Sequence, residues 1–292
     1  MRGLLPVLLL IITTSPACGQ ADPNSRTQNQ PVEPFQIFAN LYYVGASDVT
    51  SFLITTPAGH ILLDGGFAET APQILANIRK LGFNARDVKV LLNSHAHFDH
   101  AGGLPELKRA TGAVLWASRE DALLLERGGR NDFAFDDRLS YEPVAVDRMV
   151  DEGTVVRLGG SAMVAQLTPG HTKGCTTWKL SLAAAGESHS AVFVCSASVP
   201  GYRLVDNPRY PNIVEHYRGT FARLRNTRAD IFLAPHGNFF ALTAKRKKMP
   251  AAGADNPFVD AGGLQEYVES AHQAFEAELQ RQLTASSAQA SH

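Results

Sequence analysis

Apolar residues recur along the chain with two periods, and the shorter period comes first. Short β-rich runs, separated by glycine and proline, cover residues 37–44, 51–56 and 60–63. Residues 69–81 then carry apolar side chains at helical spacing, Gly82 follows as a stop, and residues 88–92 read as a buried strand. The order strand, helix, strand predicts a layered α/β fold.

Strands and helices return in the second part of the chain. Helices are predicted over residues 104–111 and 119–126, and the polar connection 127–141 is long enough to be a functional loop. Strand-rich runs, a helix, a strand and a last amphipathic helix are predicted over residues 154–167, 176–182, 191–194, 213–226, 231–234 and 264–280. No linker divides these elements. We therefore expect a single domain over residues 33–284, a flexible segment over 20–32 before it, and a polar tail over 285–292.

The first residues have the pattern of an export signal. Arg2 precedes an apolar run over residues 4–12, which is too short to span a bilayer, and small residues follow. Cys18 leaves lipoprotein anchoring open, but Ser15 stands where a lipobox usually has leucine. We predict a signal peptide over residues 1–19 and a soluble periplasmic protein without stable membrane insertion.

Composition and charge exclude several classes of protein. The 292 residues are 45% hydrophobic, as in a globular protein, and 27 basic against 28 acidic residues leave no basic field for nucleic acid. Three cysteines without C-x-x-C spacing make neither a disulfide scaffold nor a zinc ribbon. In an oxidising compartment Cys175 and Cys195 are expected to pair, although the sequence does not supply their distance.

Metal-binding side chains are concentrated directly after the strand 88–92. His95, His97, Asp99 and His100 lie within six residues. Imidazole and carboxylate are ligands that zinc prefers, and unpaired histidines crowded beside an aspartate have no comparable packing role. This cluster predicts a metal site.

Two further histidines follow strand-like runs downstream. His171 lies in Thr-Pro-Gly-His-Thr, and His236 lies in Ala-Pro-His-Gly. Taken alone, each is more typical of a structural turn. Beside the first cluster they become candidate ligands, because a metal site collects ligands from several loops.

The pattern His95-x-His97-x-Asp99-His100, with His171 and His236, resembles the metallo-β-lactamase fold superfamily. The resemblance implies a four-layer αββα sandwich, an α/β fold in which two mixed β-sheets are flanked by helices. Many hydrolases of that superfamily carry a bridging aspartate between the last two histidines, but residues 194–202 contain no carboxylate. The Ser-x-Ser and Pro-Gly-Tyr within residues 194–202 are similar to the corresponding residues of the third subclass of the metallo-β-lactamases.

That resemblance implies a site with two Zn²⁺ ions. The first would be held by His95, His97 and His171, and the second by Asp99, His100 and His236. Asp99 would also be catalytic, by orienting a metal-bound hydroxide. The remaining roles would be substrate binding by Ser196, Ser198, Phe135 and Leu139. Asp64 ends a strand just before a glycine turn, so it is either a turn or cap residue or the acceptor of a hydrogen bond from a ligand histidine.

The activity implied is zinc-dependent hydrolysis of the β-lactam amide bond of penicillins, cephalosporins and carbapenems, which would confer antibiotic resistance. We expect the enzyme to be a monomer. Two Zn²⁺ ions with one carboxylate and one hydroxide leave the site near about +2, which suits a substrate that carries its own carboxylate. Two alternatives stay open: a lactonase or other ester or thioester hydrolase of the same fold, and a secreted zinc-binding protein without turnover.

Overall fold

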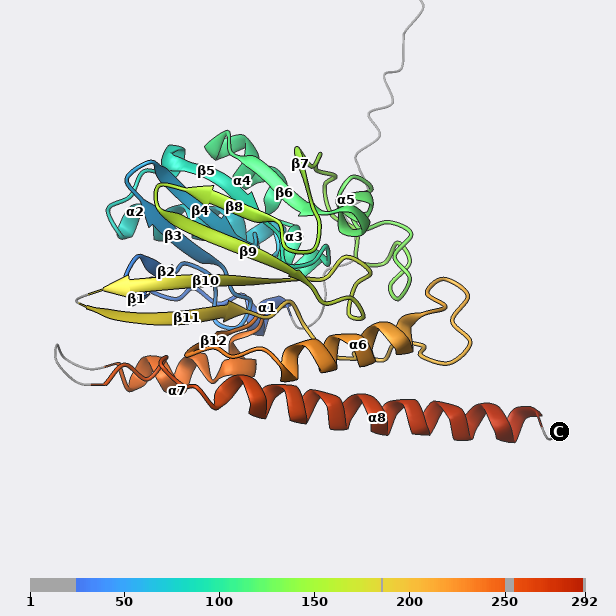
Figure 1. Ribbon diagram of the computed structural model, residues 1–292. Helices are drawn as coiled ribbons and strands as arrows, with labels where there is room; N and C mark the ends of the chain where they lie inside the picture. The colour runs from blue at the N-terminus through green and yellow to red at the C-terminus, as the bar shows by residue number, and fades with distance from the viewer. Residues whose placement is uncertain (1–24, 185, 250–254, 291–292) are drawn as a thin grey trace, which may run out of the picture.

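The structure is a computed structural model that describes residues 25–184, 186–249 and 255–290. Its strands form two mixed sheets (Figure 1). The first runs in the order β1 to β7, antiparallel as far as β4 and parallel from β4 onward. It contains β1 (Phe35–Phe38), β2 (Leu41–Tyr43), β3 (Phe52–Thr56), β4 (Gly59–Leu63), β5 (Val88–Leu92), β6 (Val114–Ser118) and β7 (Arg148–Val150).

The second sheet has the order β12-β11-β10-β9-β8, in which β11 and β12 are parallel and the other pairs are antiparallel. It contains β8 (Val155–Leu158), β9 (Ser161–Leu167), β10 (Thr176–Ala184), β11 (Glu187–Phe193) and β12 (Ile231–Leu233).

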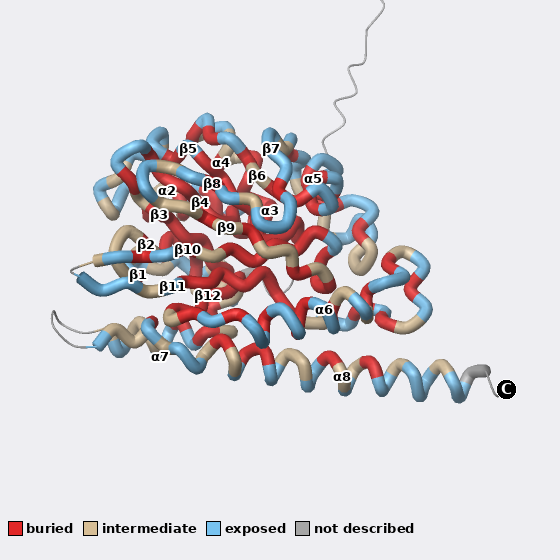
Figure 2. The backbone as a smooth tube through the Cα atoms, in the orientation of Figure 1, coloured by how far each residue is buried: buried red, intermediate tan, exposed pale blue. Residues whose placement is uncertain are grey.

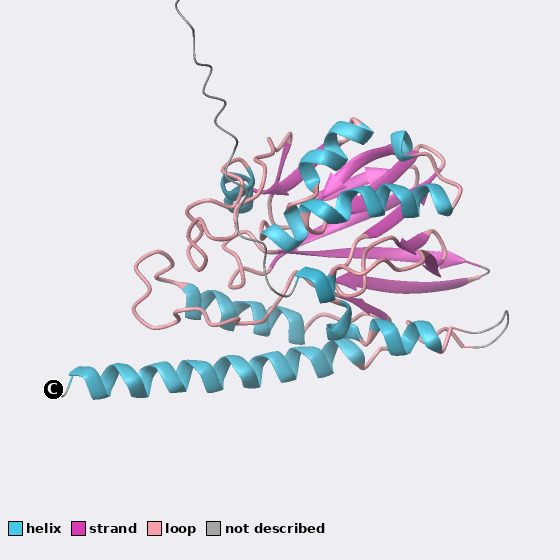
Figure 3. Ribbon diagram, turned by 180° about the vertical axis from the view of Figure 1, so that it is seen from behind, coloured by secondary structure: helices cyan, strands magenta, loops and turns pink. Residues whose placement is uncertain are grey.

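Helices cover the outer face of each sheet (Figure 3). The first sheet is covered by α2 (Ala71–Lys80), α4 (Leu104–Thr111) and α5 (Arg119–Leu125), and the second by α6 (Ile213–Arg225), α7 (Leu242–Lys247) and α8 (Gly263–Ala290). Short elements lie between them: α1 (Ser25–Gln28), α3 (Phe98–Ala101), η1 (Ala68–Thr70), η2 (Ala85–Asp87) and η3 (Gly237–Phe240). The predicted αββα sandwich is confirmed.

Alternation along the central strands produces the layers. Leu62 and Leu91 pack in the cluster that includes α2 and α4, whereas their neighbours Ile61 and Val90 pack in the cluster between the sheets. Buried residues therefore run through the middle of the molecule (Figure 2).

Most predicted elements are present, but two of the predicted strand runs are hairpins of two strands each. The predicted strand run 154–167 is the hairpin of β8 and β9, because Gly159 and Gly160 adopt positive φ values of 50° and 93° and turn the chain. The run 37–44 is likewise a hairpin of β1 and β2. Strands β6 and β7 were not predicted.

The two ends differ from expectation. Helix α8 does not end near residue 280 but continues to Ala290, so most of the expected tail 285–292 is helical, as its alanine and glutamine content allows. The expected flexible segment 20–32 is held in its second half, because backbone carbonyls of Gln28 and Gln30 accept hydrogen bonds from Asp48 and Ser47. The predicted signal peptide lies outside the described residues. Within the described part, no helix is both long and apolar enough to cross a bilayer.

Candidate metal centre

The six candidate ligands lie in three segments that each follow a strand. The segment after β5 carries four of them, two in the loop and two on α3, and the segments after β9 and β12 carry one each. These ligands are His95, His97, Asp99, His100, His171 and His236. Strands of both sheets therefore deliver side chains to one place.

His95, His97 and His171 form the first ligand group. Their candidate ligand atoms all lie within 4.8 Å of one another, and His97 Nδ1 is 3.2 Å from His171 Nε2. All three residues are buried. Burial lowers the pKa of each imidazole, that of His97 to about 4, so these rings are neutral at pH 7 and keep a lone pair for a metal.

Asp99, His100 and His236 form the second ligand group. His100 Nε2 lies 3.3 Å from Asp99 Oδ2 and 3.3 Å from His236 Nε2, and the Asp99 Oδ2 to His236 Nε2 distance is 3.4 Å. Tetrahedral zinc with bonds of about 2.0–2.1 Å places neighbouring ligand atoms about 3.3 Å apart. The three atoms therefore have the spacing of three corners of a zinc tetrahedron.

The two groups are adjacent. The rings of His95 and His100 have centroids 4.4 Å apart, and His95 also falls in one set of possible ligands with Asp99 and His100. The first group offers three imidazoles, and the second offers two imidazoles and a carboxylate. Both are sets of ligands that zinc prefers.

Electrostatics distinguish the second group. Burial alone would raise the pKa of Asp99, but His100 and His236 hold it well below its usual range. Burial would likewise lower the pKa of His236, but hydrogen bonds to Asp48 and Asp99 raise it to about 9. Without a metal, His236 is therefore a proton-carrying partner of two carboxylates.

Hydrogen bonds to the outer ring nitrogens orient two ligands. His171 Nδ1 donates to the backbone carbonyl of Ser198 at 2.9 Å, and His236 Nδ1 donates to Asp48 Oδ2 at 2.9 Å. Each bond leaves Nε2 of the same ring free to face its group, which is how metal-binding histidines are usually held.

Asp64 differs from its prediction. Its carboxylate accepts hydrogen bonds from Ser94 N at 2.7 Å and Asn93 Nδ2 at 3.1 Å, and no hydrogen bond joins it to a ligand histidine among the described residues. The expected bond to a histidine was wrong, because the end of β4 lies beside the backbone just after β5. Asp64 instead holds the segment that leads into His95.

The candidate ligands border a groove of about 440 Å³. Predicted substrate-binding residues Ser198, Phe135 and Leu139 line it beside four ligands, His97, Asp99, His171 and His236. Ser196 is buried, and its Oγ lies 3.1 Å from Ser198 Oγ. Direct substrate contact by Ser196 stays a prediction.

Cys175 and Cys195 form a disulfide, with Cα atoms 5.7 Å apart. The expected pairing is confirmed in the structure. Because both sulfur atoms are used in the bond, Cys195 is not a metal ligand.

Three acidic residues near the ligands were missed in the sequence. Asp48 contacts His236, Asp132 Oδ2 lies 3.9 Å from His97 Nε2, and Asp121 accepts a hydrogen bond from Ala96 N. Asp132 lies in the connection 127–141, which we had predicted to be a functional loop, so the sequence indicated its region but not its role. Asp48 and Asp121 are distant in the chain from the histidines that they support, and nothing in their local pattern marks them.

Comparison with known proteins places this fold in a known superfamily. The family model described as the metallo-beta-lactamase superfamily matches residues 44–236. The structure is similar to a metallo-β-lactamase of Cronobacter sakazakii, described by a HARLDQ motif, at 44% identity, with a TM-score of 0.84 over 88% of this chain and 98% of that one. It is also similar to BJP-1, a subclass B3 metallo-β-lactamase of Bradyrhizobium japonicum, at 40% identity, with a TM-score of 0.85 over 90% and 99% of the two chains.

A curated relative has a different name. The N-acyl homoserine lactonase AttM of Agrobacterium fabrum is 31% identical over 153 residues, which span 43% of this chain and 57% of the lactonase. The chain belongs to the metallo-β-lactamase superfamily. Since residues 95–100 read His-Ala-His-Phe-Asp-His here, unlike the HARLDQ motif, ligands have to be assigned from this chain's own side chains.

Proposed function

We propose that this protein is a zinc β-lactamase that hydrolyses penicillins, cephalosporins and carbapenems. The observation that carries the proposal is the pair of adjacent ligand groups, three side chains each, on a groove that also presents Ser198. Structural zinc sites are closed by four protein ligands, whereas three leave a position open for reaction. This disfavours a zinc-binding protein without turnover.

Both ligand groups fit Zn²⁺ by spacing and donor type, and we propose one ion in each. When bound, zinc lowers the pKa of water toward neutrality and polarises a carbonyl group. Asp99 would orient the attacking water with its carboxylate, and the outer hydrogen bonds of His171 and His236 would keep both rings in place.

The groove offers the contacts that a β-lactam needs. Ser198 Oγ would donate a hydrogen bond to the substrate carboxylate. Phe135 and Leu139 would pack against the apolar substituents of the lactam, since both side chains line the groove above His97. The absence of a carboxylate from residues 194–202 keeps the site more positive, which favours an anionic substrate.

Similarity to relatives supports this choice without excluding the alternative. The two structural relatives above are described as metallo-β-lactamases, and the match covers nearly the whole of each of their chains. The match to the lactonase covers a smaller share of its length. A lactonase or another ester or thioester hydrolase of the same fold is therefore the second candidate.

One set of assays tests the proposal. Purified protein should hydrolyse nitrocefin and imipenem, lose this activity in EDTA and regain it with Zn²⁺, and ignore clavulanate, which needs a serine nucleophile. His171→Ala should abolish turnover, whereas His272→Ala, on α8 outside both groups, should not. Hydrolysis of an N-acyl homoserine lactone without β-lactam turnover would reject the proposal and favour the lactonase.

We also infer a monomeric enzyme exported to the periplasm, where it would confer β-lactam resistance. The N-terminal apolar run supports export. Fractionation of expressing cells and size-exclusion chromatography of the product check both inferences. Retention in the cytoplasm would contradict the first, and an oligomer at micromolar concentration the second.

A further inference from the structure

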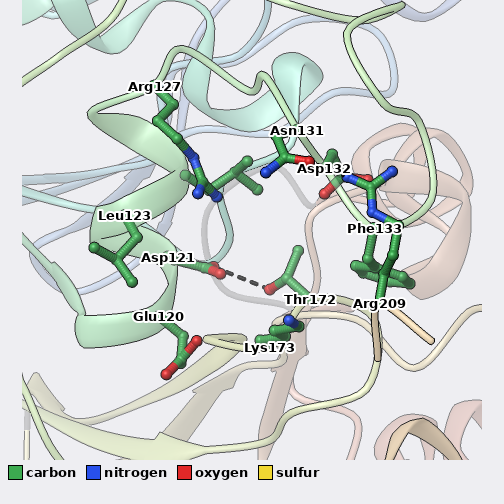
Figure 4. Close-up of a pocket in the computed structure, with 11 residues that line it drawn as sticks. Glu120, Asp121, Leu123, Arg127, Asn131, Asp132, Phe133, Thr172, Lys173 and Arg209 are labelled. Carbon is green, nitrogen blue, oxygen red and sulfur yellow. Dashed lines mark hydrogen bonds between the residues drawn. The ribbon is translucent and has the colours of Figure 1, made fainter. Parts of the chain in front are cut away.

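A buried carboxylate outside both ligand groups joins the two segments that supply the first group. Asp121 lies in the first turn of α5 and is 2% exposed. Its Oδ2 accepts a hydrogen bond from Ala96 N at 3.1 Å. The same oxygen accepts a second one from Thr172 Oγ1 at 3.0 Å, which Figure 4 shows. Ala96 stands between His95 and His97, and Thr172 follows His171. A single oxygen atom therefore bridges the neighbours of all three ligands.

The second oxygen strengthens the same link. Asp121 Oδ1 accepts from Gly174 N at 3.1 Å, so the loop after His171 is held at two points. A side chain at Gly174 would come within 2.2 Å of Ser118 Oγ and 2.5 Å of Asp121 N, so the loop can approach α5 this closely only with glycine. One further backbone bond, from Thr176 N to Ser94 O, joins these segments farther from the histidines.

Burying a carboxylate at this position costs free energy, because its ionised form loses contact with water. Burial raises the pKa of Asp121 to about 7 even with its three donors, so the protein keeps an unfavourably placed acid there. No positively charged side chain forms an ion pair with it in the described part of the chain. The three hydrogen bonds of the Asp121 carboxylate all come from the two loops that carry His95, His97 and His171.

We infer that Asp121 is a positioning residue, which sets the spacing between the His95–His97 segment and His171 and so the affinity of the first ligand group for its metal. This rests on the metal binding proposed above but not on β-lactam hydrolysis. His97 Nδ1 and His171 Nε2 face each other at 3.2 Å across these segments, and the bridging oxygen holds the backbone on both sides.

The prediction is selective loss of one metal ion. Metal-free protein is titrated with Co²⁺, whose visible spectrum reports each bound ion, and His171→Ala identifies the step that belongs to the first group. Asp121→Asn should weaken that step by about tenfold to a hundredfold, the usual effect of losing a residue that supports a metal ligand, and change the other step by less than about threefold. An amide can keep at most part of the three bonds, because its NH₂ would face the backbone N–H of either Ala96 or Gly174, and neither can accept a hydrogen bond.

Matched variants separate positioning from a general loss of stability. Asp230→Asn removes a carboxylate that likewise joins two segments, through Ser190 N and Oγ. It precedes β12, whereas His236 follows that strand, so the variant should leave both Co²⁺ steps unchanged. Thr172→Val should weaken the first step, and Thr172→Ser, which keeps the hydroxyl, should restore it. This pair carries the test if Asp121→Asn does not fold.

Three results would overturn the inference: equal weakening of both steps in Asp121→Asn, a first step unaltered in both Asp121→Asn and Thr172→Val, or wild-type protein that binds no Co²⁺. Wild-type protein that binds two ions selectively but hydrolyses no β-lactam would reject the proposed function and leave this inference standing.

Discussion

The two ligand groups lie side by side but are built in different ways. The first is more deeply buried: His95, His97 and His171 are 1%, 5% and 7% exposed, although His97 and His171 also line the groove. The second is open to the groove on one side, with Asp99 and His236 side chains 15% and 19% exposed. The first is held from behind by Asp121, whereas the second is held by Asp48 in a loop that contacts the N-terminal segment.

This difference has electrostatic consequences. Burial keeps the first group neutral, so it presents three lone pairs without giving up protons. The second group contains a carboxylate and a histidine with a pKa of about 9, so a metal there must displace a proton. We therefore expect the affinity of the first group for a metal ion to depend little on pH, and the affinity of the second group to depend strongly on pH.

The largest effect is expected from Asp99, which belongs to the open group and also lines the groove. Asp99→Asn removes the one ligand charge and the proposed orienter of water, so kcat should fall by more than about a hundredfold and the second ion should bind more weakly. Kinetics and metal analysis of the variant, beside the exposed-site control Asp87→Asn, check this. A variant with normal kcat would remove Asp99 from the reaction.

Loss of the disulfide should affect stability rather than chemistry. Cys175 and Cys195 are 20 residues apart in the chain, and a bridge of that loop length stabilises a protein by about 2–4 kcal/mol. The Cys175→Ala/Cys195→Ala double variant should unfold at lower denaturant concentration while it keeps its kcat and zinc. If the folded variant lost zinc, cysteine ligation would have to be reconsidered.

The pH dependence of metal affinity should separate the groups next. His236 is protonated below its pKa of about 9, so affinity at the second group should rise about tenfold per pH unit between pH 6 and 8 and level off above 9. The first group should change less, because the pKa of His97 is already lowered to about 4. Calorimetry in buffers of different ionisation enthalpy counts the released protons.

Asp48 sharpens this prediction. Asp48→Asn removes one of the two carboxylates that raise the pKa of His236, so the pH at which affinity levels off should fall by at least about one unit. The control Asn84→Asp changes the net charge by one at an exposed position elsewhere and should not move the profile. An unshifted profile in Asp48→Asn would show that its hydrogen bond does not govern His236.

Sequence reasoning reached the local elements and the ligands more completely than their supports. Strand β5 and helix α4 were predicted at their observed bounds, because a buried strand and a helix ending at Gly112 are encoded in neighbouring residues. His171 and His236 became candidate ligands only through the cluster at residues 95–100, and the structure brings both side chains beside that cluster.

The supports depend on packing between distant segments. Asp48 and His236 are 188 residues apart, and Asp121 and Thr172 are 51 apart. Asp64 shows the limit from the other side: its place at a strand end was recognised, but which donor it meets was decided by the neighbouring strand. Such pairings have no periodic signal in a single sequence.

The smallest effect is expected at Ser198, where the wall of the groove meets the first group. His171 Nδ1 and Tyr217 Oη both donate to the backbone carbonyl of Ser198, at 2.9 Å and 2.7 Å, and Ser198→Ala keeps that carbonyl. Zinc content should therefore stay unchanged. Loss of the Oγ hydrogen bond to the substrate carboxylate should raise KM by up to about tenfold, or about 1.5 kcal/mol, with little change in kcat. A cephalosporin methyl ester, which lacks the carboxylate charge, should be handled alike by both proteins; if the variant binds the ester and the free acid with the same relative loss, Ser198 does not contact the carboxylate.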